Sequence, residues 1–253
     1  MPDSIHQSPL YPIINPGSIV FCGASNRFSA MGTNQLNSLL SSGFEGKIYP
    51  IHPQEKQVLE LKAYQRVAEL PEVPDLAVLV LPTRIVPQAL EDCGKKGVKN
   101  IIINSGGFSE VGPEGEAYEK DFMARANNYG IRVLGPNCQG IINSDPAVRA
   151  YCNFTFTFPE PGYISIVALS GGVAEVIHQA FSAMGVGTRI YASNGNACDI
   201  SIPEILQYWA DDDETRVIVC HVESLSDPAE FLRVAAVVAV AGAGVEQRIA
   251  AEQ

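Results

Sequence analysis

The chain has 253 residues, enough for one large domain or two small ones. With 46% apolar and 18% charged residues, its composition is typical of a globular protein and excludes an intrinsically disordered or fibrous one. The 17 basic and 28 acidic residues give a formal net charge of -11, the wrong sign for neutralising nucleic acid phosphates or an anionic membrane. We therefore expect neither nucleic acid nor a membrane as a partner.

The cysteines and the first residues bear on the compartment of the protein. The six cysteines are scattered, without the spacing of a metal site or of a disulfide framework. The first residues lack the basic start and apolar run of a signal peptide, and the longest apolar stretch, residues 234–245, is too short to span a bilayer. We expect a cytoplasmic protein with reduced thiols, no metal site and no membrane segment.

Short β-branched segments alternate with longer segments of helical period, which is typical of a parallel sheet built from βαβ units. In residues 1–144 the pattern predicts strands at 18–22, 47–51, 76–81, 100–104 and 131–134, and helices around 34–40, 86–93 and 113–130. The second of these helices is marked by Val86, Leu90 and Cys93, which recur at helical spacing. The sequence therefore predicts an α/β fold whose first domain ends near residue 144.

The alternation stops at residues 145–162, where several prolines and no helical stripe predict a connector with at most one edge strand. It restarts in residues 163–253, with strands predicted at 163–167, 188–192 and 216–222. Capping boxes at Ser201 and Asp227 predict the starts of two helices. An earlier helix is predicted to have one apolar stripe, formed by Val173, Val176, Ile177, Ala180, Phe181 and Met184.

The loop that begins at Gly23 follows the first strand and precedes a helix, the place where open α/β sheets bind ligands. Gly23 lets the backbone turn close to a ligand, the next N–H groups can face a phosphate, and Arg27 adds a positive charge. An NAD-binding oxidoreductase is disfavoured, because the G-x-G-x-x-G fingerprint and an acidic residue at the end of the second strand are both missing. A plain strand-to-helix turn remains the alternative for this loop.

Two more glycine-containing loops follow strands at the same edge of the predicted sheet, at residues 105–110 and 135–140. Their glycines permit a close approach of the backbone to a ligand. Cys138 is either a reactive thiol or a small buried apolar side chain, and the second interpretation is favoured while no base or cation is known beside it. Three candidate loops are thus predicted to share one rim.

Motifs in a fixed order carry a family resemblance that the periodicity does not provide. The segments are VFCGAS, IYPIHP, LAVLVLP, SGGFSE, GPNCQG, SGG, SNGNACD and DDDETRVIVCHVES. From about Pro16 to Ala239 the chain resembles the α part of the NDP-forming acyl-CoA synthetases, which are relatives of the succinyl-CoA synthetase α chain. The resemblance implies a Rossmann-like CoA-binding domain, followed by a flavodoxin-like ligase domain in residues 163–253.

The resemblance also implies roles for the rim residues. Gly23, Ser25, Asn26 and Arg27 would lie at the nucleotide end of CoA, Pro53 and Pro82 would border it, Ser105 and Gly106 would line the pantetheine path, and Asn137 and Cys138 would lie near the reactive thiol. In the second domain, Ser170, Gly171 and Gly172 would open a helix that holds phosphate, and Glu223 matches a glutamate that orients a phosphohistidine.

The family joins a carboxylic acid to CoA through an acyl phosphate, and a histidine carries the phosphate to or from a nucleotide. That histidine stands in a loop of the type S-H-T-G or G-H-A-G, where none of His6, His52, His178 and His221 stands. His178 and His221 are interpreted as structural. The sequence after Ala239 does not resemble the expected strand, so we expect the second domain to be incomplete, with a truncated or altered end.

Other positions also depart from the family. The phosphate-gripping helix start usually reads Ser, Gln or Arg, Ser, Gly, whereas Ala168 and Leu169 stand at the first two positions here. His52 and Gln54 replace an Asn and a frequent Lys, so CoA affinity is expected to be weakened or tuned. The family's ATP-grasp domain is absent from this sequence, so ATP, ADP and Mg would enter only through a partner chain.

Two functions follow from this pattern. The first is the CoA-binding component of an acid:CoA ligase, which forms acyl-CoA only together with partner domains. The alternative is a non-catalytic CoA or acyl-CoA sensor or scaffold that has lost the phosphohistidine. An unfinished second sheet would present an exposed edge, which an ATP-grasp β-type subunit or a second copy of the chain could cover. We therefore expect the protein to associate.

Overall fold

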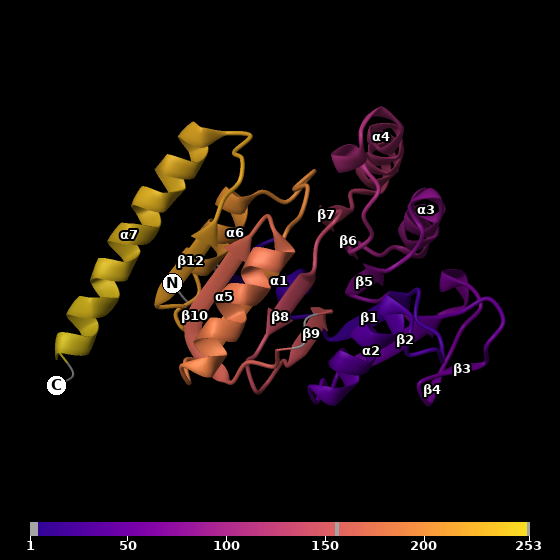
Figure 1. Cartoon of the computed structure of the whole chain (residues 1–253), viewed down its shortest axis with the longest axis horizontal. Coiled ribbons are helices and arrows are strands. Elements are labelled where there is room, and N and C mark those ends of the chain that lie inside the picture. Colours follow the sequence, from indigo (N-terminus) through magenta and orange to yellow (C-terminus); the bar gives the residue numbers. More distant parts are fainter. Residues whose placement is uncertain (1–4, 155–156, 252–253) are drawn as a thin grey trace.

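The computed structural model of the protein describes residues 5–154 and 157–251. Two five-stranded sheets lie side by side, the first on the right of Figure 1 and the second on the left, and helices pack against both. One core of buried side chains runs from one sheet into the other, because Phe21 and Leu36 of the first unit share it with Ile190 and Trp209 of the second. The two units therefore support each other through apolar packing.

The first sheet is parallel and has the strand order β2-β1-β5-β6-β7. Its strands are β1 (Ser18–Cys22), β2 (Lys47–Ile51), β5 (Leu76–Leu79), β6 (Asn100–Ile103) and β7 (Arg132–Leu134). These strands lie where the β-branched segments predict them, which confirms the α/β class. Four of the five consist largely of buried apolar residues, as expected of a parallel sheet that is covered on both faces.

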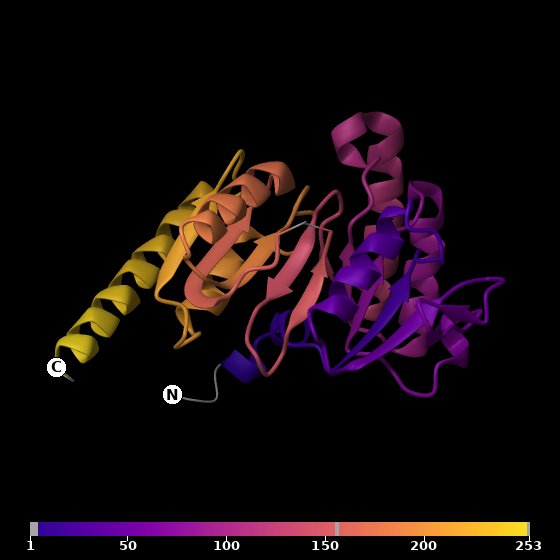
Figure 2. The same cartoon turned by 60° about the horizontal axis from the view of Figure 1, so that its bottom comes forward.

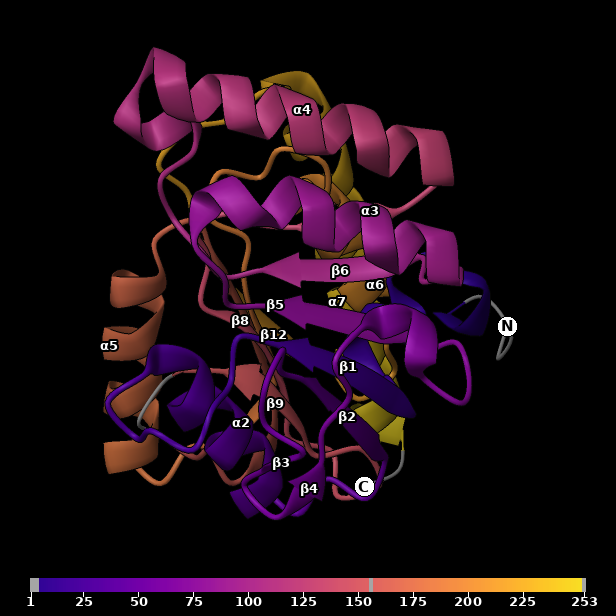
Figure 3. The same cartoon turned by 90° about the vertical axis from the view of Figure 1, so that its right-hand side faces the viewer.

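Helices cover both faces of the first sheet. They are α2 (Met31–Ser41), α3 (Val86–Lys96) and α4 (Pro113–Tyr129). Leu36 of α2 packs with Phe21, whereas Leu90 of α3 and Phe122 of α4 pack with Val20, which points to the opposite face of β1. Figure 3 shows α3 and α4 running alongside each other, away from α2. The face with α2 is also the face that meets the second unit.

The second sheet has the order β12-β10-β11-β8-β9. Its strands are β8 (Gly140–Asn143), β9 (Ala150–Asn153), β10 (Pro161–Ala168), β11 (Thr188–Ser193) and β12 (Val217–His221). The last three run parallel, while β8 and β9 form an antiparallel hairpin on the side of β11. All five lie in one layer, to the left of the first sheet in Figure 1.

The β8–β9 hairpin is the main difference from the elements predicted by the sequence, which puts residues 140–143 in the first domain and residues 145–162 in a connector. Both strands of the hairpin belong to the second sheet, and Figure 2 shows them between the two units. All four residues of β9 are buried, because α2 of the first unit lies against this edge strand. The edge strand that the sequence allows within residues 145–162 is confirmed by β9, whereas β8 was not predicted as a strand.

Three helices complete the second unit: α5 (Gly171–Ala183), α6 (Ile202–Ala210) and α7 (Pro228–Ala251). The predicted caps are confirmed, since Ser201 Oγ accepts the N–H of Glu204 (3.4 Å) and Asp227 Oδ1 accepts the N–H of Glu230 (2.9 Å). Helix α7 packs against α6 and ends at the outer side of the molecule, at the lower left of Figure 1.

The buried face of α5 differs from the predicted stripe. Val176 and Met184 are 66% and 65% exposed, whereas Ala174 and His178 are fully buried. Ile177 and Phe181 of the predicted stripe do pack partly against the sheet. The prediction is therefore wrong for Val176 and Met184, because α5 packs on β10 and β11 through a different set of residues.

Several short elements were not predicted from the sequence. They are the helical turns η1 (Ile5–Gln7), α1 (Tyr11–Ile14), η2 (Val67–Glu69), η3 (Thr83–Ile85) and η4 (Ser109–Val111), and the hairpin strands β3 (Gln57–Val58) and β4 (Leu61–Lys62). Within the described residues, no helix combines the length and the apolar character needed to cross a membrane.

Candidate functional site

The loops at the carboxyl ends of the strands are where open α/β sheets hold their ligands. The loop after β11 runs beside the loop after β7, since the N–H groups of Asn196 and Cys198 donate to the carbonyls of Pro136 (3.0 Å) and Gly135 (3.3 Å). The guanidinium of Arg132, at the start of β7, contacts the carboxylates of Asp199 (3.0 Å) and Glu204 (2.8 Å). The ligand-facing loops of the two sheets are therefore held next to each other.

The loop after β1 needs glycine at its first position. Gly23 has φ +110°, and a Cβ at this position would lie 2.0 Å from the carbonyl oxygen of Val80. Gly32 on α2 is equally constrained, because its Cβ would lie 2.4 Å from the carbonyl oxygen of Gly23. Periodicity alone does not single out Gly32, although a glycine in the first turn of a helix that follows such a loop is a usable signal.

The polar residues of this loop divide into fixed and free ones. The N–H of Ser25 donates to Thr33 Oγ1 (3.0 Å), and Asn26 holds the next loop through its contacts with the carbonyl of Gln57 and the N–H of Leu59 (3.0 Å each). Arg27 is exposed and makes no ion pair with any described residue. Ser25 and Asn26 therefore shape the loop, and Arg27 has its charge available for an anion.

Pro53 and Pro82 flank the first loop on its two sides, because they follow β2 and β5, the two neighbours of β1. The turn at Pro53 is held by His52, whose Nδ1 accepts the N–H groups of Gln54 (3.3 Å) and Glu55 (2.9 Å). The histidine thus serves as a cap for this turn, in the way that an Asn side chain would.

The loop after β6 is tied to its neighbours by short hydrogen bonds. Ser105 Oγ accepts the N–H of Leu81 (2.9 Å) and donates to the carbonyl of the same residue, and the carbonyl of Gly106 accepts the hydroxyl of Thr83 (2.7 Å). The N–H of Asn137, in the loop after β7, donates to the carbonyl of Ser105 (2.9 Å). The predicted residues Ser105, Gly106 and Asn137 are therefore brought together.

Cys138 is 3% exposed, and its Sγ lies 3.4 Å from the carbonyl oxygen of Ile103. Burial raises the pKa of the Cys138 thiol to about 12, so the sulfur is protonated and unreactive at neutral pH. The buried apolar interpretation of this cysteine is therefore confirmed over the reactive thiol.

Two predicted residues of the first unit, Pro82 and Asn26, line different cavities. Pro82 lines one of about 450 Å³ together with Gly107 and Tyr118, and Asn26 lines another, of about 610 Å³, together with Gln54. Gly23, Ser105 and Asn137 follow β1, β6 and β7 and so lie along one edge of the sheet. Such an open rim fits an extended ligand that is held along its length.

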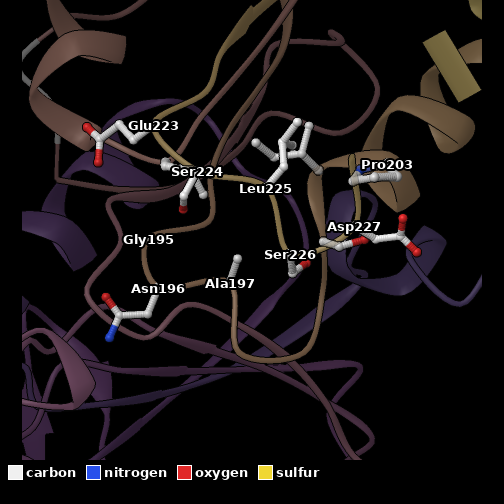
Figure 4. Close-up of a pocket in the computed structure, with 12 residues that line it drawn as sticks. Gly195, Asn196, Ala197, Pro203, Glu223, Ser224, Leu225, Ser226 and Asp227 are labelled. Atoms are coloured by element: carbon white, nitrogen blue, oxygen red, sulfur yellow. The ribbon is translucent and has the colours of Figure 1, made fainter. Parts of the chain in front are cut away.

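The second sheet has a cavity of about 240 Å³ at the carboxyl ends of β10, β11 and β12. Its lining residues are Leu169, Gly195, Asn196, Ala197, Ser201, Ile202, Pro203, Glu223, Ser224, Leu225, Ser226 and Asp227. Figure 4 shows Glu223 and Asp227 on opposite sides, with Ser224 and Ser226 between them. Of these residues only Glu223 was predicted from the sequence as a site residue. Most of the other lining residues belong to the loops after β11 and β12, and the predicted strand ends indicate where these loops begin.

Ser170, Gly171 and Gly172 lie at the start of α5. Ser170 Oγ caps the helix by accepting the N–H of Val173 (3.4 Å). Gly171 packs closely on Gln139, because a Cβ there would lie 2.5 Å from Gln139 Cγ. This contact brings the start of α5 next to the loop after β7, so the predicted phosphate-binding helix start and the predicted thiol end of the rim are neighbours.

The two histidines of the second unit occupy different environments. His178 is fully buried, with its ring 5.6 Å from the ring of Tyr191, and burial lowers its pKa. A ring without solvent access cannot exchange phosphate with a bound nucleotide, which supports the structural interpretation of His178. His221 is the last residue of β12, and its Nδ1 is buried without a hydrogen-bond partner among the described residues. In the described parts of the chain, no group of three or more His, Cys, Asp or Glu side chains is arranged to hold a metal ion.

Comparison with known families finds two matches along the chain. Residues 17–144 match the CoA binding domain, and residues 161–243 match the succinyl-CoA ligase like flavodoxin domain. The first match alone covers just over half of the chain. Together they follow the order that the motifs imply.

Individual relatives show the same arrangement. The chain is 37% identical over 223 residues to the ADP-forming 4-hydroxybutyrate–CoA ligase of Nitrosopumilus maritimus, which covers 88% of this chain and 32% of the relative. It is 34% identical over 230 residues to the α subunit of the ADP-forming acetate–CoA ligase I of Pyrococcus furiosus, covering 89% of this chain and 49% of the subunit.

A solved structure agrees with these relatives. The apo form of the dinucleotide-forming acetyl-coenzyme A synthetase 1 of Ca. Korarchaeum cryptofilum superimposes with a TM-score of 0.86 and 34% identity, over 91% of this chain and 50% of that one. The chain thus spans about a third to a half of the length of these relatives. It belongs to the family of the CoA-binding domain, joined here to a succinyl-CoA ligase-like flavodoxin domain as in the α part of the ADP-forming acyl-CoA synthetases.

Proposed function

We propose that this chain is the CoA-binding component of an ADP-forming acid:CoA ligase. The observation that carries the proposal is the rim of three interlocked loops, at Gly23, Ser105 and Asn137, which lies beside the helix start at Ser170. An extended thiol cofactor lying along this rim, with its nucleotide at Gly23, would reach the second unit with its thiol. The similarity to ligases through both units favours this function over a non-catalytic sensor or scaffold.

CoA would be held along the rim residues that the family resemblance identifies. Arg27 supplies a charge, and the backbone beyond Gly23 can approach a phosphate. Ser105, Gly106 and Asn137 line the path to the second unit. At its end, the first N–H groups of α5, at Gly171 and Gly172, would hold a phosphate group, and Glu223 lines the neighbouring cavity.

The step assigned to this chain is the exchange between an acyl phosphate and CoA. The sulfur of CoA attacks the carbonyl carbon of the acyl phosphate, the bond from that carbon to the phosphate oxygen breaks, and the thiol proton leaves with inorganic phosphate. This exchange needs no histidine. The transfer of phosphate from ATP, with Mg, is assigned to a partner chain that carries an ATP-grasp domain.

The open side of the second sheet supports association with a partner. Among the described strands, β12 pairs with β10 alone, so its other edge offers unpaired backbone groups. Val217 on this strand is 46% exposed, and Val176 on α5 adds apolar surface. An ATP-grasp β-type subunit is the proposed occupant and a second copy of the chain is the alternative; light scattering that finds only monomer, with and without such a subunit, would contradict both.

Incubation of the purified chain together with an ATP-grasp β-type subunit, in the presence of CoA and acetyl phosphate, tests the proposed step. Acetyl-CoA formation, followed by thioester absorbance, is expected to exceed that in a protein-free control. CoA binding without any exchange would instead support the sensor or scaffold. We also propose a cytoplasmic location, which the six free thiols support, and which fractionation of cells that express the protein would check.

A further inference from the structure

The side chain of Asn196 joins the two units at one point. Its Nδ2 donates to Glu110 Oε2 (2.7 Å), to Glu119 Oε2 (3.1 Å) and to Ser109 Oγ (3.1 Å). Its Oδ1 accepts a hydrogen bond from Asn137 Nδ2 (3.3 Å). One side chain of the second unit therefore contacts η4, α4 and the loop after β7 of the first unit.

The backbone at this point leaves little freedom for the side chain to lie elsewhere. Gly195 has φ +54°, and a Cβ there would lie 2.1 Å from the carbonyl oxygen of Pro136. The N–H of Asn196 donates to the same carbonyl (3.0 Å). The amide of Asn196 is thus held against the first unit by its own main chain.

The two carboxylates around the amide require a hydrogen-bond donor at position 196. Glu110 and Glu119 both direct a carboxylate oxygen at Nδ2, and neither forms an ion pair with a described Lys, Arg or His. Burial of Glu110 acts to raise the pKa of its carboxyl, but the hydrogen bonds from Asn196 and from backbone N–H groups outweigh it and hold this pKa below its ordinary value. An aspartate at position 196 would place a third negative charge between the two carboxylates.

Glu110 connects Asn196 to the loop after β6. Its carboxylate accepts the N–H groups of Gly107 (2.5 Å) and Phe108 (3.1 Å), which directly follow Gly106. On its other side, Asn196 lines the 240 Å³ cavity of the second unit. The same residue therefore borders the cavity and, through Glu110, is connected to the loop that is proposed to line the pantetheine path.

We propose that Asn196 is a positioning residue, which sets the loop at residues 105–110 against the second unit so that the thiol of bound CoA faces the cavity. The proposal rests on the proposed function for the identity of the ligand. In this proposal the contact between the two units contributes to CoA binding. The contribution comes from one neutral hydrogen-bond donor, Asn196, in addition to the shared apolar core.

The test compares CoA titrations of N196D, E110Q and the double variant E110Q/N196D with the wild type, each at pH 7.5 and pH 5. N196D exchanges an amide donor for a carboxylate, and E110Q/N196D reverses the polarity of the hydrogen bond, since the amide introduced at position 110 can donate to the new carboxylate. The matched control is N128D, which makes the same substitution on an exposed part of α4. N196S, which keeps a donor without a charge, replaces N196D if that variant does not fold.

We expect N196D to bind CoA at least about tenfold more weakly than the wild type at pH 7.5, because a charge-assisted hydrogen bond is lost and a like charge is added. The loss should shrink at pH 5, since the carboxyl introduced at position 196 lies beside like charges, binds a proton more readily and then donates a hydrogen bond. E110Q/N196D should recover to within about threefold, and N128D should match the wild type.

Two results would overturn the inference. One is unchanged CoA affinity in N196D while the wild type binds, which leaves the proposed function standing. The other is a defect in N196D that is the same at both pH values and is not rescued by E110Q, which would indicate general damage to the fold. Absence of CoA binding by the wild type would count against the proposed function itself. In that case the denaturant midpoints of the single and double variants show whether Asn196 and Glu110 are coupled.

Discussion

The imidazole of His178 lies fully buried between α5 and the second sheet, and neither of its ring nitrogens has a hydrogen-bond partner among the described residues. A buried polar group without a partner costs about 1–3 kcal/mol. Replacement by leucine removes both nitrogens and loses a ring contact with Tyr191 that is worth about 0.5–1.5 kcal/mol. The change of shape costs under about 1.5 kcal/mol more. The two nitrogens together cost about 4 kcal/mol, and the two losses together amount to about 2 kcal/mol. We therefore expect His178→Leu to raise the free energy of unfolding by about 2 kcal/mol at pH 7.

The pH dependence gives a second signature of the same group. Burial lowers the pKa of His178 in the folded protein, partly opposed by the charge of Glu175, whereas in the unfolded chain a histidine titrates near about 6.5. Below that pH the unfolded state binds more protons, so wild-type stability falls as the pH falls. The advantage of His178→Leu should therefore widen from pH 8 to pH 5.5.

Urea unfolding at several pH values measures both effects, with the fluorescence of Trp209 as the probe. Trp209 is the only tryptophan in the chain, and it is buried on α6 in the same unit as His178. His6→Leu is the control, because it makes the same substitution at an exposed position. A variant that is less stable than the wild type at pH 7, with an unchanged pH dependence, would refute the reasoning from unpaired ring nitrogens.

The remaining predictions concern the rim and the junction. Gly23→Ala should abolish CoA binding, because its Cβ would collide with the carbonyl of Val80. Gly185→Ala should lower only the stability, because Gly185 has φ +71° but open space around it. Calorimetric titration with CoA distinguishes the two variants. Arg132→Met should lower the free energy of unfolding by about 1–3 kcal/mol, less than the 3–5 kcal/mol of a fully buried pair, because the group is 30% exposed. Lys47→Met, which breaks an exposed pair, should cost under about 1 kcal/mol, and equal losses in the two variants would contradict this ranking.

Local features of the chain were predictable from its sequence. Runs of β-branched residues indicate the buried parallel strands, such as Ser18–Cys22. Capping residues indicate the helix starts at Ser201 and Asp227. The binding loops could be located because ligands meet open sheets at the carboxyl ends of strands. Periodicity and capping are local signals, so they survive without knowledge of the fold.

What the sequence could not predict depends on contacts between distant segments. Strand β9 is buried because α2 packs against it, and Val176 on α5 is exposed although it belongs to the predicted apolar stripe. The sequence around Asn196 does not distinguish it from other loop asparagines, because its contacts with Glu110 and Glu119 exist only in the folded protein. In each of these cases the environment of a residue is set by an element that is remote in sequence.

The central claim is that CoA binds along the rim of the first sheet, and calorimetric titration of the purified chain with CoA tests it most directly. We predict saturable binding of CoA by the wild type and by Gly185→Ala, and no binding by Gly23→Ala. We also predict no heat of binding when NAD replaces CoA in the titration. Absence of CoA binding by the wild type, or equal binding by Gly23→Ala, would contradict it.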